Sequence, residues 1–216
     1  PVSKNLNRLL DKEKLLGLND IKYISLFKNN VETVNTISMK TEIVTKKNTS
    51  DLDVKDSNVV ASYDDDIWKV AALDRTFGSK THAVGFLENF GADIGAFAST
   101  WSFHENDMIV IGSNENDMAD ACNKLAKSQG GLIVVKNEKT LASLPFQMGG
   151  IISTDPIEKV TKNFAKTFST AIQNLHAKEW WECILNFSAA SLLHALQVQI
   201  QRFSGRGGLG EAHMDF

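Results

Sequence analysis

Residues 108–135 read MIVIGSNENDMADACNKLAKSQGGLIVV and contain two apolar runs with a helical pattern between them. The first run, residues 108–111, is short and rich in β-branched side chains, which favours a buried strand. The second run, residues 132–135, has the same character, and continuous apolar runs are typical of strands covered on both faces. The segment therefore predicts a strand–helix–strand unit with a right-handed crossover and parallel pairing of its two strands.

The predicted helix between the two runs has its own start and stop signals. Asn114 is a candidate N-cap, and Asp117 stands three residues later, where it completes a capping box. Gly130 and Gly131 follow the last periodic residue and are expected to close the helix. One face is apolar and is expected to pack on the sheet; it comprises Met118, Ala121, Cys122, Leu125 and Ala126.

A β-hairpin is predicted immediately before this unit. Residues 94–101 form the first strand, and residues 108–111 form the second. The tip then carries His104, Glu105, Asn106 and Asp107, which place an imidazole, an amide and two carboxyl groups on one exposed turn. Such a tip can hydrogen-bond a small polar ligand in a neighbouring site. Because hairpin turns are usually polar, a purely structural tip is the alternative.

The segments further out extend the α/β pattern. Residues 31–45 and 67–73 favour strands, whereas the polar residues 46–58 favour a loop or linker. Asp64, Asp65 and Asp66 favour a solvated turn over a cation site. A strong helix is expected to begin at Asp155-Pro156, and the strict alternation of residues 196–201 predicts a half-exposed strand.

Together these elements predict a mixed α/β fold, a layered sheet core with packed helices. An amphipathic helix and short strands are expected in an N-terminal region that ends in the polar linker, residues 1–58. Residues 59–216 are expected to form the α/β domain.

The composition excludes several classes of protein. The chain has 216 residues, of which 43% are hydrophobic and 23% charged, with a net charge of −3 and a pI near 6.0. These values are typical of a globular domain, and scattered Lys and Arg provide no face for nucleic acid. Residues 183–201 lack charge but carry too many polar side chains to span a membrane. Cys122 and Cys183 are interpreted as reduced thiols, which favours a cytoplasmic protein.

Familiar chemical motifs give no independent function. Residues 205–210, GRGGLG, match a dinucleotide fingerprint, but the helix and acidic residue that should follow are missing, so a glycine-rich tail is expected. The five histidines show neither H-x-H nor H-E-x-x-H spacing. No metal centre is therefore predicted from spacing.

Four runs carry a resemblance to a known family. They are Val84-Gly85-Phe86 through Gly95-Ala96-Phe97-Ala98-Ser99-Thr100, residues 108–118, residues 130–135, and Leu144-Pro145 followed by Gly149-Gly150-Ile151-Ile152-Ser153. In order and separation they resemble the C-terminal domain of the bacterial and archaeal adenine deaminases of the amidohydrolase superfamily. The resemblance covers residues 68–153.

The resemblance implies hydrolysis of adenine to hypoxanthine and ammonia, a reaction of purine salvage. In that family a hydroxide activated by manganese or iron attacks the ring carbon that bears the amine. The metal ligands lie on an N-terminal (β/α)₈ barrel, and residues 1–66 are too few to form one. We therefore expect an accessory C-terminal domain that binds no metal itself and completes or covers the metal site of a separate barrel.

The resemblance also suggests site residues. Where most members carry a His-Asp-Ser-His-Asn-like run, this chain has Phe103-His104-Glu105-Asn106-Asp107. His104 and Glu105 are the candidates for catalysis, and His104, Glu105, Asn106 and Asp107 are the candidates for substrate binding.

Hypotheses of different classes remain open. The chain is either a domain or separate half of an adenine deaminase that docks on a barrel, or a stand-alone module that binds a purine or a protein without catalysis. An unrelated enzyme that uses Glu105 or Asp107 as a base is a third reading, but no nucleophile or cofactor site accompanies these residues. The expected partners are the barrel and adenine, with a homo-oligomer compatible with either reading, and neither nucleic acid nor a membrane.

Overall fold

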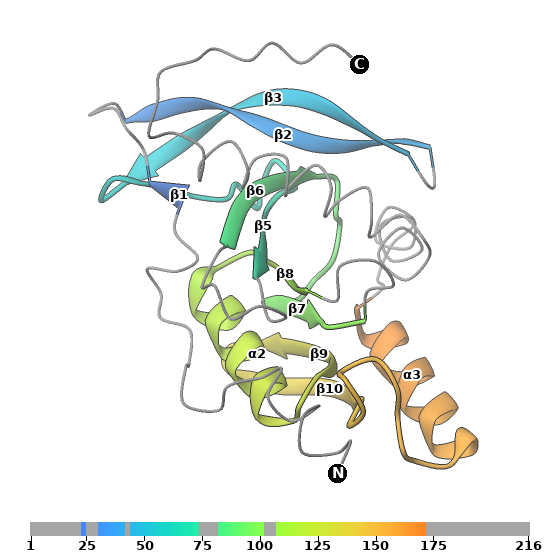
Figure 1. The fold of residues 1–216 in the computed structure, drawn as a ribbon. Helices are drawn as coiled ribbons and strands as arrows, with labels where there is room; N and C mark the ends of the chain where they lie inside the picture. Colours follow the sequence, from blue (N-terminus) through green and yellow to red (C-terminus); the bar gives the residue numbers. More distant parts are fainter. Residues whose placement is uncertain (1–22, 25–29, 42–43, 74–81, 102–106, 172–216) are drawn as a thin grey trace, which may run out of the picture.

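The computed structural model describes residues 23–24, 30–41, 44–73, 82–101 and 107–171. The strands in this part of the chain are β1 (Tyr23–Ile24), β2 (Val31–Thr41), β3 (Val44–Lys55), β4 (Asn58–Val59), β5 (Ile67–Leu73), β6 (His82–Glu88), β7 (Ala96–Ser99), β8 (Met108–Gly112), β9 (Gly131–Lys136) and β10 (Lys139–Pro145). The helices are α2 (Glu115–Lys127) and α3 (Ile157–Ala171). The strands form one mixed sheet in the order β1-β4-β3-β2-β6-β5-β8-β7-β9-β10 (Figure 1). The fold class is α/β, as predicted.

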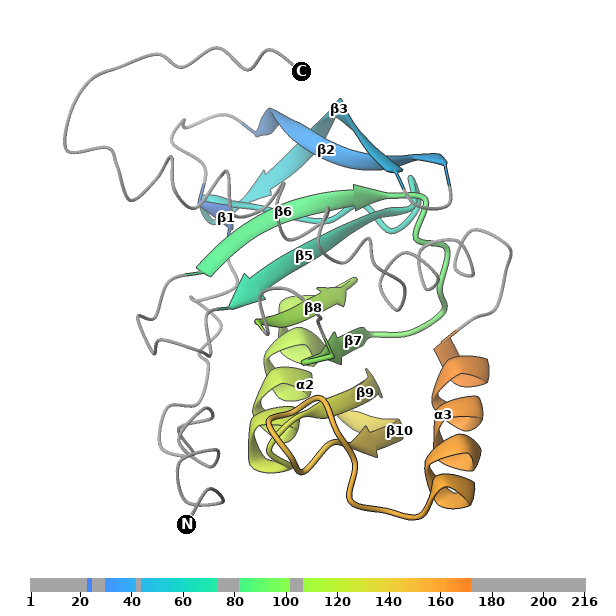
Figure 2. The same cartoon turned by 45° about the vertical axis from the view of Figure 1, so that its right-hand side comes forward.

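The centre of the sheet is covered on both faces. Every residue of β5, β7 and β8 is buried, and most of their apolar side chains alternate between two apolar clusters, while Ile67 belongs to a third. Trp68 and Val70 point into the first cluster, on which α3 packs through Val160 and Phe164. Ala71 belongs to the second cluster, which α2 covers. The two helices therefore lie on opposite faces of the sheet, as Figure 2 shows.

The predicted strand–helix–strand unit is β8–α2–β9, and the predicted hairpin is β7–β8. One detail of the prediction is wrong. The strands β8 and β9 run parallel but do not pair, because β7 lies between them and pairs antiparallel with both. The physical reason is that a short connection closes the β7–β8 hairpin at low entropic cost, which leaves the other edge of β7 for β9.

Helix α2 has the predicted N-cap and the predicted apolar face, but the predicted capping box is wrong, because the Asp117 carboxylate accepts from the N–H groups of Asn137 and Glu138 and from Asn114 Nδ2, and not from the backbone N–H of Asn114. The Asn114 side chain accepts a hydrogen bond from the backbone N–H of Asp117 at 2.8 Å, which is the N-cap interaction. The buried residues of the helix include Met118, Cys122 and Leu125. The helix ends at Lys127, and the positive-φ glycines Gly130 and Gly131 then turn the chain into β9.

The predicted loop at residues 46–58 is wrong. These residues supply most of β3, which pairs antiparallel with β2 from Val31–Asp53 to Thr41–Val44. The turn lies later, at Asp56 and Ser57, which both have positive φ. Polar residues are tolerated in β3 because its side chains are largely exposed and its backbone bonds to β2 hold it in place. The strands β6 and β10 were also not predicted.

Other expectations have mixed outcomes. The Asp64–Asp66 run forms a turn, as predicted, and the helix after Pro156 is α3. Neither α2 nor α3, the helices of the described residues, is long and apolar enough to cross a membrane. The expected helix before residue 23, the strand at residues 196–201, Cys183 and the glycine-rich tail lie outside the described residues. The domain boundary at residue 58 stays a prediction.

Candidate functional site

The predicted hairpin tip joins β7 to β8 at one end of the central strands. The connection runs over residues 100–107, because β7 ends at Ser99, two residues before the predicted end of that strand; of it the structure describes Thr100, Trp101 and Asp107, the last of the predicted tip residues. The prediction of an exposed turn is wrong for Asp107, which is buried, with 8% of its surface exposed, because it directly precedes the buried strand β8. His104, Glu105 and Asn106 lie outside the described residues. The structure therefore describes the site at two places, where the chain leaves β7 and where it enters β8.

Thr100 fixes the position at which the tip leaves β7. Its side chain is fully buried, and its Oγ1 donates a hydrogen bond to the carbonyl oxygen of Gly150 at 2.6 Å. The same oxygen accepts a hydrogen bond from the N–H of Gly131 at 2.8 Å, and the Thr100 N–H donates to the Gly131 carbonyl at 3.0 Å. Because buried polar groups are costly to leave unpaired, these bonds hold the end of β7, the start of β9 and the loop after β10 together.

Glycine is required where these three segments meet. Gly130 has φ 110°, and a Cβ atom there would lie 2.5 Å from Gly150 Cα and 2.6 Å from Thr100 Oγ1. Gly131 has φ 128°, and a Cβ atom there would lie 2.0 Å from the carbonyl oxygen of Leu144. A side chain at either position would meet both backbone strain and a collision. Three of the four sequence runs that carry the family resemblance thus converge around Thr100.

An aromatic cluster supports the next residue of the tip. The ring of Trp101 packs edge-on against Phe146, with centroids 5.9 Å apart, and against Phe164 of α3, with centroids 6.0 Å apart. The Trp101 N–H also donates to Ser99 Oγ at 3.0 Å. Edge-to-face pairs of this kind add about 1 kcal/mol each beyond the area they bury. The first part of the tip is therefore packed between α3 and the loop after β10.

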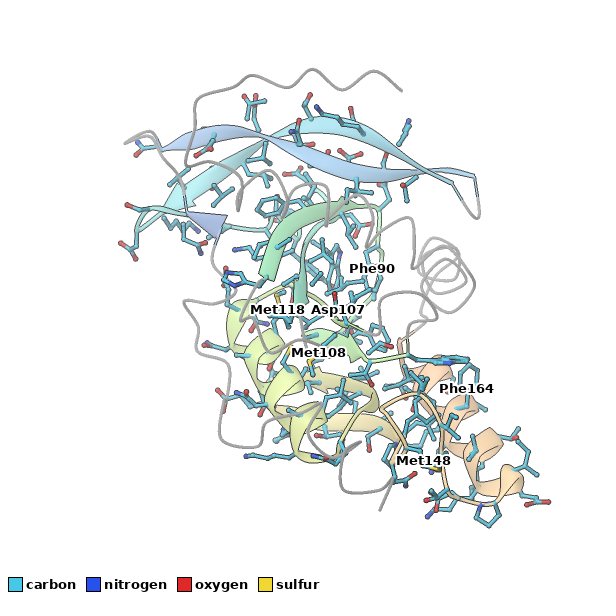
Figure 3. All side chains as sticks on the ribbon, in the orientation of Figure 1. Phe90, Asp107, Met108, Met118, Met148 and Phe164 are labelled. Carbon is cyan, nitrogen blue, oxygen red and sulfur yellow. The ribbon has the colours of Figure 1, made fainter. Side chains whose placement is uncertain are left out.

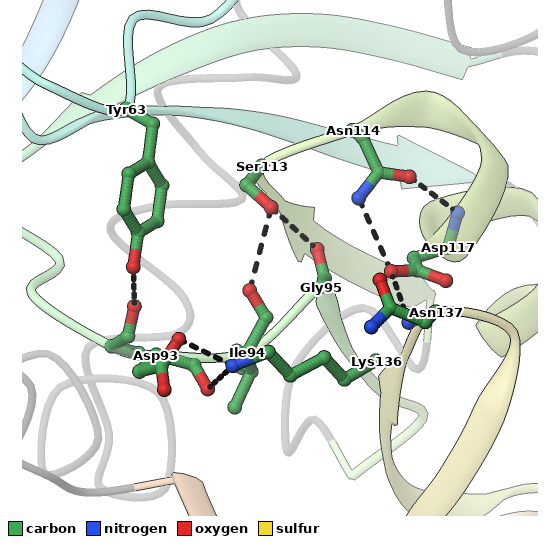
Figure 4. A network of polar contacts seen from close by, with 10 residues as sticks. Tyr63, Asp93, Ile94, Gly95, Ser113, Asn114, Asp117, Lys136 and Asn137 are labelled. Carbon is green, nitrogen blue, oxygen red and sulfur yellow. Dashed lines mark hydrogen bonds and ion pairs between the residues drawn. The ribbon is translucent and has the colours of Figure 1, made fainter.

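The opposite end of the same strands is held by Asp117 (Figure 4). Its Oδ1 accepts a hydrogen bond from the N–H of Glu138 at 2.6 Å, and its Oδ2 accepts from the N–H of Asn137 at 3.0 Å and from Asn114 Nδ2 at 3.1 Å. A Cβ atom on Gly95 would lie 1.7 Å from Oδ2. Both oxygens are engaged in joining α2 to the β9–β10 turn, so Asp117 has a structural role and is a poor candidate for a general base.

A buried lysine joins β5 to β4 and α2. Lys69 Nζ lies 2.6 Å from Glu115 Oε1 and also donates to the Val59 carbonyl at 2.8 Å and to Asn58 Oδ1 at 3.2 Å. Burial raises the pKa of Glu115, but the hydrogen bond and positive charge of Lys69 outweigh it and lower that pKa overall. Both ions are paired within the protein, which gives this cluster a structural role.

A third carboxylate joins β6 to the β2–β3 hairpin. Glu88 accepts hydrogen bonds from Thr36 Oγ1 at 2.5 Å, Asn48 Nδ2 at 3.0 Å and Ser50 Oγ at 3.0 Å. Burial raises the pKa of Glu88, but these hydrogen bonds and the charge of Lys46 lower it overall. This network fixes the long hairpin to the rest of the sheet.

The described residues hold no group of three or more His, Cys, Asp or Glu side chains that could bind a metal ion. Among the acidic residues there, Asp117, Glu115 and Glu88 bind backbone and side-chain donors instead. Burial raises the pKa of the Cys122 thiol, which disfavours the thiolate that a metal needs.

Comparison with known proteins identifies the family. The model of the adenine deaminase C-terminal domain matches residues 42–202, which include every described strand from β3 to β10 and both helices. This chain belongs to the adenine deaminase C-terminal domain family. The match confirms the resemblance and extends beyond residues 68–153 on both sides.

Curated relatives of this C-terminal domain are named adenine deaminase. That of Cenarchaeum symbiosum is 46% identical over 179 residues, which are 80% of this chain and 29% of the relative. That of Methanosphaera stadtmanae is 35% identical over 136 residues, which are 62% of this chain and 24% of the relative. That of Moorella thermoacetica is 34% identical over 127 residues, 59% of this chain and 21% of the relative. The chain thus spans less than a third of the length of these relatives.

Sequence reasoning did not single out Thr100 or the aromatic cluster of this adenine deaminase C-terminal domain. The signal that was available is the pairing of glycines, at 130–131 and at 149–150, because adjacent glycines often mark close backbone approach. That signal does not say which residue is approached. Only the fold brings Thr100 to both pairs.

Proposed function

We propose that this chain is the accessory C-terminal domain of an adenine deaminase. It docks on a catalytic barrel, and the assembly hydrolyses adenine to hypoxanthine and ammonia in purine salvage in the cytoplasm. The observation that carries the proposal is the family match over residues 42–202. The relatives named adenine deaminase support it, since more than two thirds of their length lies outside the matched part. That length is ample for a barrel of about 250 residues.

The hairpin tip is the part of this domain that we assign to the substrate. In the proposal, His104, Glu105, Asn106 and Asp107 contact the purine, with His104 and Glu105 as the candidates for proton transfer. An imidazole and carboxylates suit hydrogen bonding to ring nitrogens and an exocyclic amine. The bonds of Thr100 and the packing of Trp101 support this assignment, because a site residue must be held by rigid neighbours to act. The manganese or iron of the family's chemistry is assigned to the barrel.

Reconstitution tests the proposal. The purified chain is mixed with the part of the Cenarchaeum symbiosum adenine deaminase outside the matched segment, in the presence of Mn²⁺ or Fe²⁺, and ammonia release from adenine is followed. We expect release with both components together and little with either alone. Absence of release from every combination, with both components folded by circular dichroism, would contradict the proposal.

Calorimetry separates this function from a stand-alone purine-binding module. The chain alone is titrated with adenine and with hypoxanthine. We expect no saturable binding, because the proposed purine site is complete only when the barrel is docked on the hairpin tip. Binding in the micromolar range by the chain alone, without turnover in the mixture, would instead identify a purine sensor.

A further inference from the structure

The exposed apolar side chains of this domain are concentrated in one short stretch. Of the six large apolar side chains exposed in the described residues, three fall within residues 148–157. They are Met148, Ile152 and Ile157, which are 46%, 54% and 69% exposed. The other three, Val31, Tyr63 and Leu141, are separated along the chain. Figure 3 labels Met148, which lies in the loop between β10 and α3.

The loop that carries Met148 and Ile152 is held in one conformation. The two residues exchange backbone hydrogen bonds, Met148 N–H to Ile152 O at 3.0 Å and Ile152 N–H to Met148 O at 3.1 Å. Between them, Gly149 and Gly150 adopt positive φ, and the Gly150 carbonyl accepts the hydrogen bond from Thr100. Because the backbone of the loop is already ordered, docking of a partner on it costs little backbone entropy.

Helix α3 continues the apolar surface. Val160 and Phe164, three and seven residues after Ile157, pack on the first core cluster. Ile157 lies on the same helical face but is exposed. The apolar face of α3 therefore extends past the edge of the domain core towards the loop. Exposed clusters of this kind usually mark interaction sites, because solvated apolar surface is unfavourable.

We propose that the exposed apolar side chains of this stretch, Met148 and Ile152 in the loop and Ile157 at the start of α3, which we call the apolar surface, are where this domain docks on the catalytic part of an adenine deaminase. This inference rests on the proposed function and names the contact surface that it needs. The occupant is chosen because the relatives carry more than two thirds of their chain outside the matched part. In each of these relatives the remaining chain is part of the same protein as the C-terminal domain, so it is always available as a partner.

The chemistry of the loop fits a protein surface of apolar character. Residues 146–154, FQMGGIIST, contain no charged side chain. Centres of protein interfaces are depleted in charge and enriched in Met and aromatic residues, whereas a nucleic acid would require basic groups. Through Gly150 the loop is bonded to Thr100, which begins the hairpin tip. Docking at this loop would therefore hold the hairpin tip at a fixed position relative to the barrel.

The test measures binding, not turnover. The full chain and the variants Met148→Asp, Ile152→Asp and Ile157→Asp are purified separately and titrated with the unmatched part of the Cenarchaeum symbiosum enzyme, and the affinity of each is measured by calorimetry. We expect each variant to bind at least about tenfold more weakly than the wild type, since a charge in the centre of an apolar contact is unpaired. Val31→Asp is the matched control, because Val31 is 48% exposed and lies on β2. It should bind like the wild type.

The outcomes are distinct. If the wild type binds and the three variants bind equally well, the docking surface is wrong while the proposed function stands. If the wild type does not bind at all, both are wrong. If sedimentation shows that the chain alone forms a dimer that Met148→Asp dissociates, the occupant is a second copy and the proposal is overturned. Unchanged thermal unfolding of the variants excludes misfolding as the cause of lost binding.

Discussion

The hydroxyl of Thr100 donates a hydrogen bond to the carbonyl oxygen of Gly150, 2.6 Å away and 50 positions later in the chain. The same hydroxyl accepts from the N–H of Gly131. One buried side chain therefore connects the end of β7, the start of β9 and the loop after β10. The hairpin tip begins at the first of these segments, and the loop that carries Met148 and Ile152 is the last, so Thr100 links the two.

Replacing Thr100 with valine tests this connection. Valine keeps the shape of threonine but leaves the Gly150 carbonyl and the Gly131 N–H without their partner. We expect Thr100→Val to lower the free energy of unfolding by about 2 kcal/mol, measured by urea denaturation. Thr140→Val, at an exposed position of β10, is the control and should change it by less than about 0.5 kcal/mol. Equal effects of the two substitutions would show that the Thr100 bonds are not important for stability.

The stability of the protein should depend on the two acceptor oxygens of Asp117 as strongly as on the hydroxyl of Thr100. Asparagine places an amide donor opposite backbone N–H groups that now bond to the carboxylate. We expect Asp117→Asn to cost about 2 kcal/mol in thermal or urea unfolding. Asp120→Asn weakens the ion pair with Lys124 one turn later on the same helix, where both side chains are half-buried, but Asp120 bonds no backbone N–H of the described residues, so it should cost less than about 1 kcal/mol. A loss as large for Asp120→Asn would contradict the assignment.

The Lys69–Glu115 pair should show strong coupling. Lys69→Met leaves Glu115 without its cation and is expected to lower stability by about 3 kcal/mol. The double variant Lys69→Met/Glu115→Leu removes both charges, so it should recover part of that loss. A double-mutant cycle built on urea unfolding measures the interaction. If the double variant loses as much unfolding free energy as the two single variants Lys69→Met and Glu115→Leu lose together, or more, the pair is not the source of the effect.

The carboxylates of Glu88 and Glu115 predict sensitivity to acid. The pKa of each is lower in the folded protein than the ordinary value of 4.5, so the folded state favours the ionised forms. Their contribution to stability is therefore present above pH 4.5 and is lost as the pH falls through the lowered pKa values. In urea titrations from pH 7 to pH 3, Glu88→Gln should show a shallower loss of stability below pH 4.5 than the wild type. An identical pH profile would contradict this.

The role proposed for the hairpin tip is tested by its histidine. In the reconstituted deaminase, His104→Ala should lower kcat/KM by about 100-fold, the lower end of the effect of a proton-transfer group. His82→Ala, at an exposed position of β6, is the control and should stay within about twofold of the wild type. Affinity for the barrel should be unchanged in both variants. If the two histidines have the same effect on turnover, the tip has no special role in the reaction.

Elements with local signals were predicted best. The start of α2 depends on Asn114 and Asp117, three residues apart, and the strands β5 and β8 are continuous apolar runs, so their causes lie within a short window. The β3 strand was missed because Lys46, Lys47 and Asn48 have low strand propensity. Pairing with β2 stabilises them, and that interaction is not visible in the residues themselves.

The sequence alone determined the α/β class, the helix caps, the β7–β8 hairpin and, through four spaced runs, the family. These follow from periodicity, capping and glycine placement, which act between neighbours in the chain. The tertiary structure decided that β7 separates β8 from β9, that Thr100 bonds to Gly131 and Gly150, and that Met148 and Ile152 face outward while Val160 and Phe164 face inward. Such contacts join residues tens of positions apart, and their energies exist only once the sheet has brought those residues together.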